Sequence, residues 1–362
     1  SEDIRPKFLE YDIDFLNPSG HSDDPSEMLE NGESWSTGRE HEDIGDSRTP
    51  EEIPECPYNE NRSMLLEFTI PENDTTGYNK IVTLPILSNT TYFPATHSKG
   101  IRIDWGDGTI TTMNATSGDA GNTHTYASSG TYLVKISGKL YQFGLGTTAW
   151  TSGRNYLTKC LSFGTGLDLR SLSGAFRDGA DALIVPKYLP STITNMHNIF
   201  RNCNGANFNP DVSQWNTGSV TTMLGTFNGC SGANFNPDVS QWNTGSVTDM
   251  RYMFNNCYGA SFNGGRGISG SGIASWQLRQ AGVDCTSFMA NAKVQKAEYM
   301  DAILLAWAER HTSGLLPVNV TIEFPANQPY NGSVSGASLK LLTDATAEGG
   351  AGWTISTLVD QE

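Results

Sequence analysis

The side chains best suited to chemistry before residue 130 are carboxylates and one histidine in glycine-containing stretches. Asp104 and Asp107 flank Gly106 in DWGDGT, and Asp119 follows in a second polar stretch. Carboxylates in a glycine-rich loop are suitable hard ligands for Ca²⁺, but Asp-Gly is also the usual chemistry of a tight turn between strands. We therefore predict that this stretch holds no metal site. If it held one, Asp104 and Asp107 would be the ligands. His124 is interpreted as a packed or hydrogen-bonded side chain and not as a catalytic base.

The cysteines form no metal-ligand motif. None belongs to a C-x-x-C pair, and none stands with a histidine at zinc spacing. Three recur at an interval of 27 residues, which indicates a buried row of small soft side chains. Stacked thiols at equivalent positions cannot all pair, although the spacing allows one disulfide. These three are Cys203, Cys230 and Cys257.

The remaining titratable residues define no active site. The histidines are at positions 21, 41, 97, 124, 197 and 311, in no triad or metal motif. Two carboxylates can always meet in a folded chain, as glycoside hydrolysis requires, but nothing in the sequence ties two of them to one cleft. We expect a protein that is not an enzyme and that uses no cofactor.

The dominant pattern is a repeat. Residues 205–221 and 232–248 both read GANFNPDVSQWNTGSVT, and the register continues beyond them at an interval of 27 residues. Units of this length cannot bury their own apolar face, so neighbouring units must stack. The recurring Trp, Val, Met, Phe and Cys are expected to form an inward ladder at strand spacing, about 4.8 Å. An incomplete upstream copy supplies Met196, Phe200 and Cys203.

The repeat resembles the surface leucine-rich repeats of the BspA-like family, whose units follow the pattern D-[IV]-S-x-W-[ND]-T-x-x-V-T-x-M-x-x-M-F. The matching segments are 211–217, 220–223, 238–244 and 247–254. Good copies cover 205–258, and degenerate ones extend the resemblance to 170–292. The resemblance implies short parallel strands around Val220 and Val247, each followed by a turn or short helix.

The segment before the repeats has a different resemblance. DWGDGT at 104–109, HTY at 124–126 and GTYLV at 130–134 occur in the order typical of a PKD-type domain. The resemblance implies an immunoglobulin-like β-sandwich that serves as a spacer or a protein-binding module. Strand-like runs at 64–70 and 81–87 agree with this, and Tyr126 is expected at a corner of the sandwich.

The end of the chain differs from both. Residues 298–310 place apolar side chains on one helical face, and a strand at 318–324, a helix at 337–342 and a strand at 353–355 are expected to follow. This order resembles the capping module that follows such repeats. The helix face consists of Met300, Ile303, Leu304 and Trp307.

Together these patterns predict a mainly β multidomain protein. It would contain an acidic extended anchoring arm (1–62), a PKD-like sandwich (63–141), a BspA-like leucine-rich-repeat solenoid (142–292) and a small α/β C-terminal cap (293–362). No run of 18 or more apolar residues is present, so no membrane span is expected.

The negative charge is concentrated at the start of the chain. The net charge is −16, and residues 1–61 carry 18 acidic and 4 basic side chains. A chain this acidic is a poor ligand for nucleic acid, because phosphate contacts need Lys and Arg. The first residues lack the basic-then-apolar layout of a signal peptide, so we expect that either a signal or only an initiator Met was removed before Ser1.

One piece of this acidic arm has a strand-like pattern. Tyr11, Ile13 and Phe15 alternate with acidic residues, which suits a strand with one apolar face. An isolated strand is not stable in water, so we expect this piece to dock on a sheet edge of a partner or of its own chain. The alternative is a tail with a chance apolar cluster.

The two good repeats are identical up to Thr221 and Thr248 and then diverge at positions that face solvent. A copied scaffold with a varied surface suits recognition by an extended face, and Tyr and Arg carry a large share of interface energy. The alternative is drift of solvated positions after a duplication. The candidate recognition surface is Thr222, Leu224, Asp249, Arg251, Tyr252 and Tyr258.

These features favour a non-enzymatic structural, decoration or fibre-like protein at the surface of a phage or viral particle. Its arm would bind other proteins of the particle or surface assembly, and its repeats would contact a host-surface protein or a glycan. The alternative is a secreted bacterial cell-surface adhesin of the BspA-like family.

Overall fold

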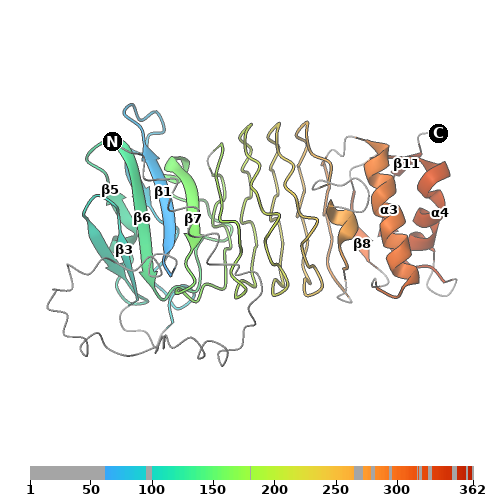
Figure 1. The fold of residues 1–362 in the computed structure, drawn as a ribbon, viewed down its shortest axis with the longest axis horizontal. Helices are drawn as coiled ribbons and strands as arrows, with labels where there is room; N and C mark the ends of the chain where they lie inside the picture. The colour runs from blue at the N-terminus through green and yellow to red at the C-terminus, as the bar shows by residue number, and fades with distance from the viewer. Residues whose placement is uncertain are drawn as a thin grey trace, which may run out of the picture. The chain divides into compact units, whose positions relative to one another are not determined.

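The computed structural model describes most of the chain after residue 61 and is mainly β, with two α-helices near the C-terminus of the described part (Figure 1). The predicted arm, with Tyr11, Ile13 and Phe15, lies outside the described residues. The described residues are 62–94, 100–179, 181–264, 272–278, 282–292, 296–315, 317, 320–324, 328–344, 349–355 and 358–360.

An antiparallel five-stranded sheet opens the described chain, with the strand order β4-β3-β6-β1-β7. In β1, next to the edge strand β7, the burial alternates, so that Met64, Leu66 and Phe68 face the core, as period-2 patterning requires. The strands of this sheet are β1 (Met64–Ile70), β3 (Ile101–Asp104), β4 (Ile110–Met113), β6 (Gly130–Gly138) and β7 (Leu157–Phe163).

A separate antiparallel pair is formed by β2 (Ile81–Thr83) and β5 (Thr123–Thr125). The strand expected at 81–87 is therefore shorter than its apolar pattern indicated. Pro85 has no amide hydrogen to donate to a sheet, which opposes continuation of the strand.

Strand β7 joins the sheet to the repeats. It pairs with β1 along one edge, while Lys159 forms a parallel bridge with Ile184 and the Cys160 amide donates to the Ile184 carbonyl at 2.8 Å. Residues that the sequence pattern assigns to the start of the repeats thus complete the sheet as well.

From Gln142, before β7, to Asp284 the chain forms successive turns that pair through single parallel bridges. The bridges join Gln142 to Ser171, Ser171 to Asn195, Asn195 to Thr222, Thr222 to Asp249, and Asp249 to Asp284. We call the stretches that follow these bridges the first to fifth paired segments: 171–179, 195–203, 222–230, 249–257 and 284–292. The pairing falls at Thr222 and Asp249, slightly after the positions expected around Val220 and Val247.

Regular backbone hydrogen bonds fix each paired segment to the next. In the second segment, alternate amides donate to carbonyls of the third over 2.7–3.1 Å. The four pairs are Met196 to Thr222, Asn198 to Leu224, Phe200 to Thr226, and Asn202 to Asn228. This ladder holds successive segments in one register, so equivalent side chains of neighbouring turns must lie beside one another.

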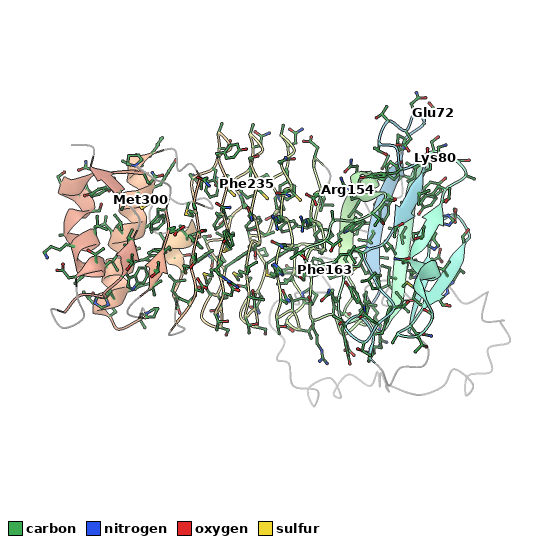
Figure 2. All side chains as sticks on the ribbon, turned by 180° about the vertical axis from the view of Figure 1, so that it is seen from behind. Glu72, Lys80, Arg154, Phe163, Phe235 and Met300 are labelled. Atoms are coloured by element: carbon green, nitrogen blue, oxygen red, sulfur yellow. The ribbon has the colours of Figure 1, made fainter. Side chains whose placement is uncertain are left out.

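Aromatic rings fill the interior of the turns. Phe227 stacks between Phe200 and Phe254, with ring centroids 5.5 and 5.4 Å apart. Trp242 stacks between Trp215 and Trp276 at 6.3 and 6.5 Å, with interplanar angles of 2°. These distances exceed strand spacing and fall in the range of offset stacking. Buried side chains fill the interior of the sheet, of the turns and of the helical part. Figure 2 labels one from each of these parts, namely Phe163, Phe235 and Met300.

The C-terminal part packs against the last turn. Met289 donates its amide to the Glu323 carbonyl at 2.8 Å, and Trp307 Nε1 donates to the Ile273 carbonyl at 3.3 Å. The expected helix face is confirmed, because Met300, Ile303, Leu304 and Trp307 are all buried in α3. The elements are α3 (Ala297–Thr312), β8 (Thr321–Ile322), β9 (Gln328–Tyr330), α4 (Gly332–Thr343), β10 (Thr354–Ile355) and β11 (Leu358–Asp360). No helix in the described residues is long and apolar enough to cross a membrane.

Candidate functional site

Each paired segment places two residues in the left-handed backbone region, four positions apart. The φ angles in the second segment are 54° and 58°, in the third 59° and 79°, and in the fourth 56° and 59°. Glycine adopts this region freely and asparagine tolerates it, whereas a bulky side chain costs about 1–2 kcal/mol. The residues concerned are Asn198 and Asn202, Gly225 and Gly229, and Tyr252 and Asn256.

The two glycines of the third segment lie against side chains of the second segment. A Cβ atom added at Gly225 would overlap Asn198 Oδ1, and one added at Gly229 would overlap Asn202 Oδ1. The third segment therefore offers no side chain at these two positions. Because the segments on both sides do carry side chains there, a hollow forms between them.

The hollow is a groove of about 400 Å³. Its second-segment wall consists of His197, Asn198, Arg201 and Asn202, and its fourth-segment wall consists of Tyr252, Asn255 and Asn256. Leu224 and Asn228 of the third segment lie between these walls, and Thr147 completes the lining. The lining is thus rich in primary amides and includes one tyrosine, one histidine and one arginine.

Arg201 is the unpaired cation of the groove. Its Nε is buried and has no hydrogen-bond partner, and within the described chain its guanidinium forms no ion pair. Two neighbouring arginines differ in this respect, since Arg177 contacts Asp178 at 3.0 Å and Arg251 contacts Asp249 at 2.8 Å. A buried donor without a partner is costly. Because Arg201 also lines the groove, its guanidinium is the positive charge that a ligand there would meet.

His197 is held neutral beside this cation. Burial lowers its pKa, the nearby guanidinium groups of Arg201, Arg177 and Arg251 lower it further, and Asp249 opposes them. Its Nε2 lies 2.9 Å from the Asn198 amide nitrogen, a donor, so Nε2 accepts. The Nδ1 hydrogen then points to Ser173 Oγ at 3.3 Å. The ring orients the Asn198 side chain and adds no charge to the groove.

The structure brings two of the six predicted surface residues into this groove, namely Leu224 and Tyr252. Tyr252 has 40% of its surface exposed and forms part of the wall. Tyr258 is 57% exposed but does not line the groove.

The other three predicted residues serve the pairing of the turns. Thr222 and Asp249 bridge each other, and Arg251 Nε donates to Asp249 Oδ1 at 3.0 Å while approaching Asp284 at 3.4 Å. Arg251 thus links the fourth and fifth segments and is occupied by carboxylates.

Sequence analysis missed the second-segment wall of the groove. It used the incomplete upstream copy only for its apolar residues, and it compared the surfaces of the two full copies alone. Aligning all three copies gives Asn, Gly, Tyr at one left-handed position and Asn, Gly, Asn at the other. That alternation of side chain and glycine was the pattern from which the groove could have been predicted.

The carboxylates considered as metal ligands are engaged within their turn. Asp104 Oδ1 accepts from the Gly106 amide at 3.1 Å, and Asp107 lies 2.7 Å from His124 Nε2. Burial raises the pKa of Asp107, but hydrogen bonds from Thr109 and His124 outweigh burial and lower it overall. No group of three or more His, Cys, Asp or Glu side chains that could hold a metal occurs among the described residues.

The cysteine row lies in the interior of the turns. Cys203, Cys230 and Cys257 are free thiols, each within 3.2 Å of the carbonyl of a phenylalanine in the preceding turn. Burial raises the pKa of all three thiols, to about 12 for Cys203. They are therefore protonated and contribute to packing, away from the groove.

A family model described as "Mycoplasma protein of unknown function, DUF285" matches residues 170–301. Neither a curated protein nor a solved structure matches the chain. The matched residues include all of the groove except Thr147.

Proposed function

We propose that this chain is a non-enzymatic structural and recognition protein whose repeats hold a binding groove at a surface. Residues 142–292 would form a BspA-like leucine-rich-repeat solenoid, supported by the parallel bridges and the stacked Phe and Trp rings. The cap at 293–362 would protect the last turn, to which its Glu323 carbonyl and Trp307 indole are bonded.

The observation that carries the proposal is Tyr252. It occupies a backbone position with φ 56° that glycine fills in the preceding turn, and 40% of the residue's surface is exposed. The fold gains little from an exposed ring and bears the backbone strain. Strained backbone conformations cluster at functional sites. Tyr252 therefore indicates selection for a contact outside the chain.

A PKD-type sandwich is proposed for residues 63–141. The five-stranded sheet and the β2–β5 pair are consistent with two layers, and the Tyr126 hydroxyl donates to the Trp105 carbonyl at 2.9 Å. Such a bond back to the upstream chain is typical of a tyrosine at a sandwich corner. The proposed role of this domain is to space the repeats from the arm.

We further propose that the protein belongs to the surface of a phage or viral particle, anchored by its acidic arm through Tyr11, Ile13 and Phe15. Support comes from the alternating pattern of that piece and from the concentration of charge in the arm. The second candidate is a secreted bacterial surface adhesin, favoured by a family match whose description names a bacterial genus.

Immunogold electron microscopy with antibodies against the full chain distinguishes the two settings. We expect gold on purified particles and loss of incorporation when Tyr11, Ile13 and Phe15 are all replaced by Asp. The matched control replaces Asp12 and Asp14 by Asn in the same stretch and should incorporate normally. Gold on the cell envelope alone would support the adhesin, and label confined to the cell interior would contradict both settings.

A further inference from the structure

We propose that the groove between the second and fourth paired segments binds a saccharide carrying a carboxylate group. The proposal rests on the groove being the recognition site of the protein and specifies the chemical class of its ligand. The groove volume, about 400 Å³, lies within the range of small-ligand sites, about 300–1,000 Å³. A short sugar chain fits this scale, whereas a protein interface of standard size buries about 800 Å² on each partner.

The charge of the lining selects an anion. Among the described residues that line the groove, Arg201 is the cation, and none is Asp or Glu. Among the described residues the Arg201 guanidinium has no ion pair, unlike those of Arg177 and Arg251, and a carboxylate is the group that a guanidinium binds in two-point geometry. A nucleotide or polyphosphate would need more Lys and Arg than this single side chain supplies.

The amides select hydroxyl groups. A primary amide presents one acceptor and two hydrogens, and the contacts within the protein use only part of this capacity. Asn255 donates to Asn228 Oδ1 at 3.3 Å, and Asn202 donates to Asp178 Oδ1 at 3.0 Å. The Asn256 side chain lines the same wall. Neighbouring sugar hydroxyls, each both donor and acceptor, match such a row.

Tyr252 supplies the apolar contact. Tyr252 is part of the wall. Its left-handed backbone, with φ 56°, fixes the point from which the side chain projects. An aromatic face accepts the C–H side of a sugar ring while its hydroxyl reaches water. Leu224 adds a second apolar surface between the walls. The combination of one cation, several amides and one exposed aromatic ring favours an acidic sugar over an acidic peptide, which would more commonly dock on a strand edge or in an apolar pocket.

The test is binding of the full chain to immobilised oligosaccharides that end in a sialic or uronic acid. Each sugar is presented beside its methyl ester, which removes the charge and keeps the shape. Acidic peptides are included on the same surface. We expect binding to one or more acids and at least about tenfold weaker binding to the matched ester, the loss expected for a charge-assisted hydrogen bond.

Two substitutions assign the binding to the groove. Arg201→Gln should weaken binding of the acid at least about tenfold and bring acid and ester to the same level. Tyr252→Gly should weaken acid and ester alike. Arg102→Gln and Tyr258→Gly are the matched controls, because neither residue lines the groove, and both should bind as the unmodified chain does. Thermal unfolding of every variant identifies those that fail to fold.

Equal binding of acid and ester, binding of peptides without sugars, or no binding to any probe would overturn the proposal. So would a loss of binding in the folded control variants. The microscopy above tests the location of the protein and not its ligand. Gold label at a surface together with no sugar binding would therefore reject the ligand class alone. Gold label confined to the cell interior would reject the proposed function, whatever the result of the sugar-binding assay.

Discussion

The third and fourth paired segments, 222–230 and 249–257, share most of their interior and differ more at their surfaces; inside, buried Thr226 is replaced by buried Met253. Phe227 and Phe254 stack on each other at 5.4 Å inside the turns. On the outside, the third segment has glycine at its two left-handed positions, where the fourth has Tyr252 and Asn256. Because the φ angles of Gly225 and Tyr252 differ by only 3°, 59° against 56°, the backbone at this position is nearly the same in the two segments although the side chain has changed.

This difference distinguishes the backbone angle that folding requires from the side chain that folding does not require. Folding needs the left-handed angle, and glycine provides it without strain. Folding does not need a tyrosine there. The two glycines of the third segment therefore leave the gap of the groove, and the tyrosine of the fourth segment forms part of one wall.

The largest effect is expected where the two segments agree. Phe227→Ala and Phe254→Ala each leave a cavity in the stacked interior, where both rings are fully buried, and each should lower the free energy of unfolding by about 3–5 kcal/mol. Chemical denaturation monitored by circular dichroism measures this. Tyr258→Ala, at an exposed position, is the control and should change little. A large difference between the two phenylalanines would show that the segments are not equivalent inside.

A smaller but more informative effect is expected from copying the tyrosine into the third segment. Gly225→Tyr places a side chain where Asn198 Oδ1 lies and adds backbone strain, so we expect a loss of about 1–3 kcal/mol in the free energy of unfolding.

The control for that substitution is a rescue. In the native chain Tyr252 follows a segment with glycine at the equivalent position, so Asn198→Gly combined with Gly225→Tyr recreates the native arrangement one turn earlier. We expect the double variant to recover part of the lost stability, a non-additivity typical of residues in contact. Additive losses would mean that Asn198 does not determine the glycine at position 225.

Sequence analysis predicted the interior of the turns better than their surface. The interval of 27 residues identified Phe227, Trp242 and Cys230 as interior positions because inward residues must repeat wherever neighbouring turns stack. It missed Trp276, which completes the tryptophan stack, because a glycine-rich insertion at 264–272 shifts this residue out of the interval.

The groove could be predicted only in part. Divergence between the two full copies identified Tyr252 and Leu224, since both positions face outward in each copy. Arg201 and His197 lie in the incomplete upstream copy, whose apolar residues were aligned with the later copies but whose surface positions were not compared with theirs. The same comparison also selected Arg251, whose pairing with Asp249 and Asp284 depends on how adjacent turns meet. Such pairing is a property of the stack and not of one repeat.

Tyr252→Gly should raise stability or leave it unchanged. The substitution removes about 1–2 kcal/mol of left-handed strain and adds about 0.5–1 kcal/mol of chain entropy to the unfolded state. The net effect is a gain between zero and about 1.5 kcal/mol. Thermal unfolding compared with Tyr258→Gly measures it, because Tyr258 is not among the left-handed residues of the described chain. Tyr258→Gly should be destabilising, and equal changes in the two variants would remove the argument that Tyr252 is strained.

The smallest effect concerns the neutral histidine of the second segment. The folded pKa of His197 is lower than its unfolded value of about 6.5. Between these two pKa values the unfolded chain binds the additional proton, so the free energy of unfolding should fall as the pH falls below about 6.5 and should be insensitive to this group above it. The ring is partly exposed, so solvent screening reduces the effect. Urea denaturation between pH 5 and 8, compared with His197→Gln, isolates the contribution. If both proteins lose stability in parallel over that range, other groups cause the loss, and burial together with the nearby arginines does not lower the pKa of His197.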